Sequence, residues 1–138
     1  MIIECANQFD CPGITKNYVL YTFKWYEKKG SLQTLKGFGG MTVGFNQLPA
    51  GTDFAPLLQG LTNNSCQCPH WGYMVEGELI IKYDDGKEET LTAGDVFYMP
   101  PGHTAAVTKD MKFLDFSPEK ELDLVLEHIA KKMAEFSK

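Results

Sequence analysis

Arginine is absent from this 138-residue chain: its 13 basic residues are all lysines, and its formal net charge is −5. Arginine supplies the planar fork that binds phosphates and guanine edges through two hydrogen bonds at once. An acidic chain without it is a poor candidate for binding nucleic acid or an anionic membrane surface. We therefore expect neither of these partners.

Long apolar runs and a basic leader are missing as well. No segment approaches the roughly 18 apolar residues of a membrane span, and residues 1–5 lack the basic and long apolar regions of a secretory signal. Apolar residues make up 43% of the chain and charged residues 22%, which is the profile of a globular protein. We expect a single domain located in the cytoplasm.

Cysteine is limited to Cys5, Cys11, Cys66 and Cys68. Without an export signal, reduced thiols are a better expectation than disulfides. Cys66 and Cys68 are too close in sequence to bridge easily in an extended segment, because their side chains would run parallel. Metal ligation and plain burial remain open as the two interpretations of this pair.

Short strand-forming segments separated by Gly, Pro and Asp turns fill most of the chain. Residues 18–26 are rich in aromatic strand formers, and residues 41–48 alternate between apolar and polar side chains. Turn residues at 76–78, 84–86 and 93–95 separate further expected strands at 70–75, 79–83, 88–91, 96–99, 105–108 and 112–116. This spacing favours an antiparallel sandwich or barrel.

The hydrophobic period changes near residue 117. Ser117 and Pro118 have the residue types of a helix N-cap and a first helical position. We expect the helix that follows to pack its apolar face on the barrel or on a partner subunit, and His128 to have a structural or solvent-exposed role. The apolar residues at helical spacing are Leu122, Val125, Leu126, Ile129, Met133 and Phe136.

Cys66, Cys68 and His70 carry the most evident chemistry. Side chains alternate along an extended strand, so these three would point to one face, and Pro69 favours extended backbone at Cys68. Thiolate and imidazole are preferred zinc ligands and also suit other late divalent metals. The alternative is that small buried thiols simply fill a core.

His103 is a fourth candidate ligand. It follows two prolines and Gly102, which hold its loop at low entropic cost; a histidine on a surface loop is the alternative. Together with Cys66, Cys68 and His70 it predicts one divalent metal site, with zinc as the expected ion. A pocket beside this site is expected to be lined by Tyr73, Met74 and Tyr98.

Residues 64–109 resemble the two-motif signature of the cupin superfamily. The first cupin motif places two histidines, a glutamate and a glycine at fixed spacing. Gly77 matches that glycine, and His70 stands at the glutamate position. Cys66 and Asn64 stand where the two histidines of the family would be.

The second cupin motif keeps its glycines and proline, but other residues stand at its ligand positions. Gly94, Pro100 and Gly102 match it in register. Ala105 stands at the histidine position and a lysine at the asparagine position. His103 lies two residues before the lost histidine, so strand alternation would keep it on the same face.

The resemblance implies an all-β fold, the cupin double-stranded β-helix or jelly-roll barrel, with a C-terminal α-helix. We expect residues 1–40 to be an N-terminal strand segment of the same domain, residues 41–116 the barrel, and residues 117–138 the amphipathic helix. Because cupins are commonly dimeric, the resemblance also implies a homodimer.

Three functions agree with these residues, and whether the chain is an enzyme stays open. The first is a metal-binding cupin that binds or acts on a small polar molecule; four ligands would close the site, whereas three would leave a position for water or substrate. Iron-dependent oxygenase chemistry is less favoured because no carboxylate stands at the aligned positions. The second function is a metal-free binding or sensor cupin. The third, redox sensing by a cysteine pair, requires exposed thiols of low pKa.

Overall fold

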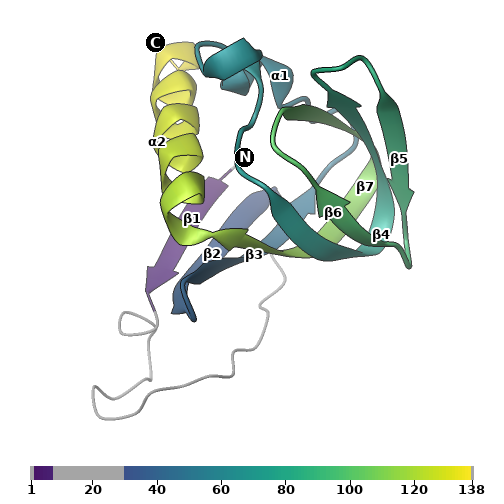
Figure 1. Cartoon of the computed structure of the whole chain (residues 1–138), viewed down its shortest axis with the longest axis horizontal. Helices are drawn as coiled ribbons and strands as arrows, with labels where there is room; N and C mark the ends of the chain where they lie inside the picture. The colour runs from purple at the N-terminus through teal and green to yellow at the C-terminus, as the bar shows by residue number, and fades with distance from the viewer. Residues whose placement is uncertain (1, 8–29, 138) are drawn as a thin grey trace.

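The computed structural model describes residues 2–7 and 30–137 (Figure 1). The strand expected at residues 18–26 lies outside this part of the chain. The elements are β1 (Ile2–Asn7), β2 (Ser31–Phe38), β3 (Met41–Leu48), α1 (Ala55–Leu58), a 3-10 turn η1 (Thr62–Asn64), β4 (His70–Tyr83), β5 (Glu88–Thr92), β6 (Val96–Met99), β7 (His103–Pro118) and α2 (Glu119–Phe136).

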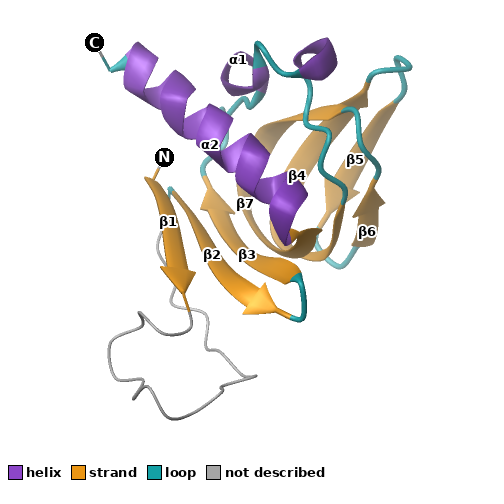
Figure 2. Cartoon of the chain, turned by 60° about the vertical axis from the view of Figure 1, so that its left-hand side comes forward, coloured by secondary structure: helices purple, strands orange, loops and turns teal. Residues whose placement is uncertain are grey.

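The strands form one curved sheet with α2 across its concave side (Figure 2). The hydrogen-bonded order is β1-β2-β3-β7-β4-β5, and β6 pairs with β4 beside that path. Neighbouring strands are antiparallel except β1 and β2, which are parallel. The expected all-β class with a C-terminal helix is confirmed, although the strand pairing of the described residues does not close into a ring.

The turn residues of the sequence place two reversals correctly. Gly86 has a φ of 88° and its N–H donates to the Tyr83 carbonyl at 2.9 Å, which closes the β4–β5 hairpin. Gly94 has a φ of 97° in the turn between β5 and β6. Only glycine adopts such backbone angles without strain, so both turns follow from the residue type.

The turn expected at residues 76–78 is wrong. Strand β4 runs unbroken from His70 to Tyr83, with irregular register against β7 around Glu76 and Glu78. Gly77 has a φ of 87°, and a Cβ there would lie 2.6 Å from the Met111 Cα. The glycine therefore allows a bulge in a continuous strand instead of a chain reversal. The segments 105–108 and 112–116 likewise belong to one strand, β7.

The start of the terminal helix also differs from the expectation. Ser117 and Pro118 are the last residues of β7, where they pair with Thr42 and Met41. The helix begins at Glu119, and the Ser117 side chain is fully buried instead of capping it. Sheet pairing has overridden the local capping signal.

The apolar stripe of α2 faces the sheet as its period predicts. Leu122, Val125 and Ile129 are buried, whereas Phe136 is 60% exposed. The His128 Nε2 lies 2.7 Å from the Gln59 carbonyl oxygen, so this histidine ties α2 to the segment after α1. Among the described residues, no helix is long and apolar enough to cross a membrane.

Candidate metal centre

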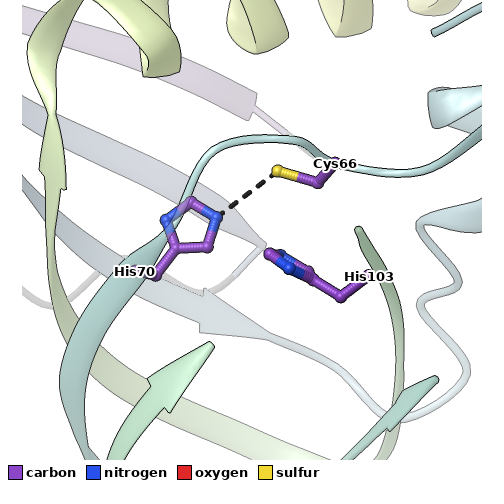
Figure 3. Close-up of side chains that lie close together, drawn as sticks. All are labelled: Cys66, His70 and His103. Atoms are coloured by element: carbon purple, nitrogen blue, oxygen red, sulfur yellow. Dashed lines mark hydrogen bonds between the residues drawn. The ribbon is translucent and has the colours of Figure 1, made fainter. Parts of the chain in front are cut away.

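Three of the four predicted ligands converge on one point (Figure 3). One ligand atom each from Cys66, His70 and His103 lies within 4.8 Å of the other two. The Cys66 Sγ is 3.5 Å from the His70 Nε2, and the two imidazole rings are 5.1 Å apart at an angle of 70°. The residues come from the loop before β4, the start of β4 and the start of β7.

Backbone pairing fixes Cys66 beside His103. The Cys66 N–H donates to the His103 carbonyl at 2.8 Å, and the Cys66 carbonyl accepts from Gly102 at 2.8 Å and from His103 at 3.2 Å. The Gly102 φ of 90° makes this close pairing possible. Two residues far apart in sequence are thus held by a local bridge, which limits the movement of both side chains.

The loop before Cys66 is anchored by a carboxylate from the β4–β5 hairpin. The Asp84 Oδ2 accepts hydrogen bonds from the Asn63 Nδ2 at 3.2 Å and from the Ser65 Oγ at 3.0 Å. Asn63 and Asn64 both have positive φ, of 57° and 55°, a conformation that asparagine tolerates better than most residues. These contacts set the direction from which Cys66 enters the site.

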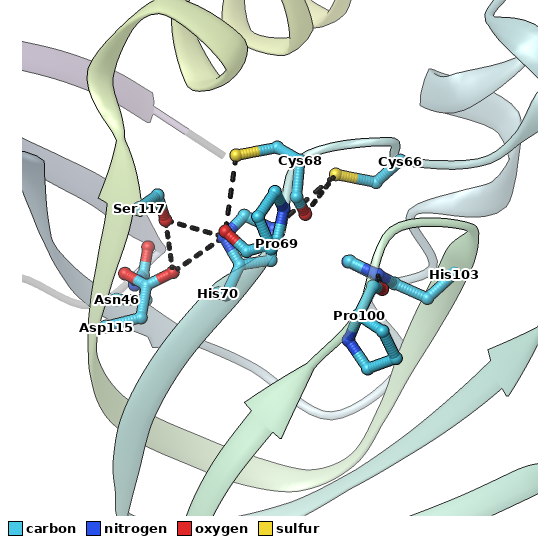
Figure 4. A network of polar contacts seen from close by, with 9 residues as sticks. All are labelled: Asn46, Cys66, Cys68, Pro69, His70, Pro100, His103, Asp115 and Ser117. Atoms are coloured by element: carbon cyan, nitrogen blue, oxygen red, sulfur yellow. Dashed lines mark hydrogen bonds and ion pairs between the residues drawn. The ribbon is translucent and has the colours of Figure 1, made fainter.

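The hydrogen bonds of His70 determine which ring nitrogen faces the cluster (Figure 4). Its Nδ1 lies 2.6 Å from the Ser117 Oγ and 3.4 Å from the Asp115 Oδ2. The Ser117 hydroxyl in turn reaches the Asp115 Oδ2 at 3.5 Å. A proton on Nδ1 satisfies this chain of acceptors, so Nε2 carries the lone pair and points toward Cys66.

His103 is in the same tautomer as His70, with the proton on Nδ1, for a different reason. Its Nδ1 is 2.7 Å from the Pro100 carbonyl oxygen. Because a carbonyl only accepts, Nδ1 must carry the proton and Nε2 is left as the free lone pair. Both imidazoles therefore offer Nε2 as a ligand atom, each oriented by a partner on its far side, as is usual for metal-binding histidines.

Asp115 is the buried anchor of this arrangement. Its Oδ1 accepts from the Asn46 Nδ2 at 3.2 Å, and burial raises its pKa to about 7, while the hydrogen bonds from Asn46 and Ser117 act in the opposite direction. A Cβ at Gly44 would overlap the Asp115 Oδ1 and lie 2.9 Å from the Asn46 Nδ2. Glycine at position 44 makes room for the carboxyl group.

The electrostatics of the three convergent residues fit a cation. Burial lowers the pKa of His70 to about 3 and also lowers that of His103. Both rings are therefore neutral and can offer a lone pair to a metal. Burial raises the pKa of the Cys66 thiol to about 11. A buried thiol ionises readily only beside a positive charge, which a divalent metal supplies. One thiol and two imidazoles match the preferences of zinc.

Cys68 does not join the cluster. Its side chain is 1% exposed and its Sγ lies 3.4 Å from the Pro69 carbonyl oxygen. Burial raises its pKa strongly, and the side chain packs in the apolar cluster formed with α2. The backbone bends at Cys68, so the alternation expected from Cys66 to His70 does not hold there.

The three residues expected to line the pocket are placed elsewhere. Tyr73 and Tyr98 are 44% and 50% exposed, and Met74 is fully buried in the core. None of the three is among the described residues that line the cavity beside the cluster. Tyr73 lies an odd number of positions from His70, and Tyr98 pairs with Trp71 in the sheet, so alternation turns both away from the site.

The sequence reasoning missed Asp115, Ser117 and Asn46. A signal was available for the first two, since Asp115 and Ser117 alternate with Leu114 and Phe116. Polar side chains at alternate positions of an expected strand indicate a polar surface on one of its faces. Asn46 carried the same signal, because it follows Phe45 in the expected strand at residues 41–48, where apolar and polar residues alternate.

A cavity of about 110 Å³ adjoins the cluster, between the concave face of the sheet and α2. Cys66, His70, His103 and Asp115 contribute polar groups to its lining. The remaining lining residues are mostly apolar: Leu32, Thr34, Gly44, Asn46, Phe54, Leu58, Leu79, Met99, Thr104, Ala105, Phe113, Leu122, Val125, Leu126 and Ile129.

Comparison with known proteins agrees with this architecture. Residues 64–115 match the family model described as the EutQ-like cupin domain. This matched segment contains Cys66, His70, His103 and Asp115. The chain therefore contains a cupin domain over residues 64–115. A search of curated proteins gives no match.

Three solved structures of low sequence identity are similar to this chain. A protein from Neisseria meningitidis is 13% identical, with 67% of this chain and 88% of that chain covered at a TM-score of 0.50. A cupin superfamily protein from Desulfitobacterium hafniense is 14% identical, with 68% and 83% covered and a TM-score of 0.49. The EutQ protein of Clostridium difficile is 15% identical, with 63% and 60% covered and a TM-score of 0.47. At these identities the likeness concerns the fold alone.

Proposed function

We propose that the chain is a metal-binding cupin in which Cys66, His70 and His103 hold one divalent ion, zinc, beside a small-molecule cavity. The observation that carries this proposal is the convergence of one thiol and two imidazoles whose Nδ1 atoms face other partners. Three protein ligands leave a coordination position open, which is the arrangement of sites that bind water or substrate. Bound there, the ion supplies Lewis acidity to a ligand in the cavity.

Each protein residue has a defined part in this proposal. The Cys66 thiolate and the two Nε2 atoms bind the ion. Ser117 and Asp115 orient His70, and the Pro100 carbonyl orients His103. The apolar residues of α2 form one wall of the cavity. Cys68 is assigned to packing, so we no longer include it among the ligands.

A metal-free binding cupin is the second candidate. The burial that raises the Cys66 pKa to about 11 and lowers the His70 pKa to about 3 keeps the site neutral without an ion. In that state the same residues would act as hydrogen-bonding groups in the cavity wall. The metal content of the purified chain distinguishes the two candidates.

The test is elemental analysis of the chain purified without a histidine tag. We expect about one zinc per chain. Cys66→Ser should remove most of it, and Cys68→Ser is the matched control that should keep it. A folded parent protein free of metal, or equal metal content in the two variants, would overturn the metal-binding proposal.

Three broader expectations from the sequence remain proposals. We propose that the curved sheet is the jelly-roll barrel of cupins, formed by residues 41–116 with residues 1–40 and 117–138 attached to it in one domain. We also propose a homodimer located in the cytoplasm. Light scattering of the purified chain tests the homodimer, and a monomeric mass would contradict it.

A further inference from the structure

We propose, building on the metal site above, that this cavity takes a small, uncharged and largely apolar molecule that presents one lone-pair atom to the metal. This differs from the polar ligand expected from the sequence. Three features of the described cavity support it: its charged groups are already engaged, its walls are apolar, and its volume is small.

The cavity offers no free charged group to a ligand. Its titratable lining residues, among those described, are Cys66, His70, His103 and Asp115. No lysine of residues 2–7 or 30–137 lines it, so among these residues an anionic ligand would meet no cation other than the metal.

A cationic ligand would also lack a partner. The Asp115 Oδ1 accepts from Asn46 at 3.2 Å, and its Oδ2 is shared by His70 at 3.4 Å and Ser117 at 3.5 Å. An ammonium group entering the cavity would compete with these donors for the two carboxyl oxygens. Burying an ion without a partner is costly, so the engaged carboxyl disfavours a cation and the missing lysine disfavours an anion.

The apolar walls of the cavity favour ligands with apolar groups over ligands with polar groups. Leu122, Val125 and Ile129 of α2 form one side, and Leu79 and Phe113 of the sheet belong to the other. A hydroxyl buried against such walls without a hydrogen-bond partner loses free energy relative to water. A sugar or another polyhydroxylated molecule therefore fits poorly, whereas an alkyl or aromatic group gains from burial.

The volume limits the size. At about 110 Å³, the cavity is somewhat smaller than the engineered apolar cavity of about 150 Å³ that binds benzene or xenon. It is well below the roughly 300–1,000 Å³ of sites for drug-sized ligands. The ligand should thus have about the size of a five- or six-membered ring and use its single donor atom at the open metal position.

The experiment uses the chain loaded with Co²⁺, whose visible spectrum reports changes in the metal's ligands. Pyrazole, a neutral ring with one free lone pair, and acetate are titrated at constant ionic strength, and ethylammonium, which has no lone pair for the metal, is tested by its competition with pyrazole. We expect pyrazole to alter the spectrum at a Kd at least tenfold below that of either ion. Equal or tighter binding of acetate or ethylammonium would overturn the proposed ligand class.

Matched variants on α2 test whether pyrazole binds in the cavity. Leu126→Phe adds bulk to a lining residue, whereas Leu124→Phe changes a neighbour that is 67% exposed. The first should weaken pyrazole at least tenfold with Co²⁺ stoichiometry retained, and the second should leave it unchanged. If the larger residue prevents folding, Leu126→Ala decides instead: it enlarges the cavity and should improve binding of 4-propylpyrazole relative to pyrazole. No change in that ratio contradicts the assignment.

Xenon separates failure of the ligand class from failure of the metal site. Binding of xenon to the metal-free chain, followed by ¹²⁹Xe chemical shift, requires only an apolar cavity. Saturable xenon binding that is reduced by Leu126→Phe supports the small apolar cavity. If Co²⁺ then fails to bind, the metal site and the lone-pair contact to it are overturned and only the apolar cavity stands. Absence of saturable xenon binding in a folded chain overturns the apolar cavity while leaving the metal site standing.

Discussion

The two faces of strands β4 and β6 differ sharply in what they carry. His70 points to the concave face and the metal cluster, whereas the next residue, Trp71, is 43% exposed on the other face. Trp71 stacks on Tyr98 at 5.0 Å and 24°. Tyr73 and Val96, paired in the same register, are 44% and 83% exposed. One short stretch of chain thus builds a chemical site on one side and an open apolar surface on the other.

The comparison shows how strand geometry separates functions that are adjacent in sequence. Side chains alternate with a period of two, so neighbours in the chain have unrelated environments. Substitutions at neighbouring positions should therefore have unrelated consequences. Each of the following predictions compares an inward-facing residue with an outward-facing or exposed one.

The largest difference is expected between His70→Ala and Trp71→Ala. Removing the imidazole takes away one of three ligands, so nearly all bound metal should be lost on dialysis. Trp71→Ala leaves all three ligands in place and should retain the parent's metal content. Elemental analysis of the two proteins, with circular dichroism to confirm folding, measures this; equal metal loss would show that the faces are not independent.

Met99→Ala and Tyr98→Ala compare a buried with an exposed position in their effect on the free energy of unfolding. Met99 is 4% exposed in the core, and Met→Ala substitutions at buried positions cost about 2–5 kcal/mol. Tyr98 is 50% exposed, and its replacement by Ala should cost less than about 1 kcal/mol. Urea denaturation of the metal-free proteins gives both free energies of unfolding. The prediction fails if Tyr98→Ala is the more destabilising change.

Asp115→Asn should weaken metal binding without abolishing it. The substitution alters the group that helps to orient His70, and loss of such partners typically lowers metal affinity about 10–100-fold. Asp85→Asn, in the exposed β4–β5 turn, is the control. Competition with a chromophoric chelator measures both affinities. An unchanged affinity for Asp115→Asn would remove this carboxyl from the site.

The smallest effect is expected at Gly44. A Cβ there would overlap the Asp115 Oδ1, and added bulk in a packed region costs about 1–3 kcal/mol. Gly44→Ala should therefore lower stability and shift Asp115, with a modest loss of metal affinity. Gly86→Ala strains a turn with a φ of 88° but has nothing within 4 Å of its Cβ, so its metal affinity should stay at the parent value.

The parts of the fold that follow from local residue chemistry were predictable. Asp85-Gly86 specifies a hairpin whatever surrounds it, and the motif spacing placed His70 and Cys66 in register with ligand positions. The bulge at Gly77 was not predictable, because a glycine with positive φ serves a turn or a bulge equally well. Its close approach to Met111, on another strand, decides between them.

The site was predictable only as far as alternation holds. Cys66, His70 and His103 do meet, but the bend at Cys68 breaks the pattern. Ser117 stands before a proline and has the sequence of a helix start, yet β7 continues through it. Its pairing with Thr42, far away in the chain, brings its hydroxyl to His70 and is a tertiary effect that local propensity does not contain.

Strand β7 supplies His103 at its beginning and Asp115 and Ser117 at its end. Between them, Phe113 and Leu114 are each paired on both sides, with β3 and with β4. Deleting or inserting one codon here would exchange the inward and outward positions of every residue that follows. A change in the length of this stretch should therefore be more damaging than the substitution of any single residue in it.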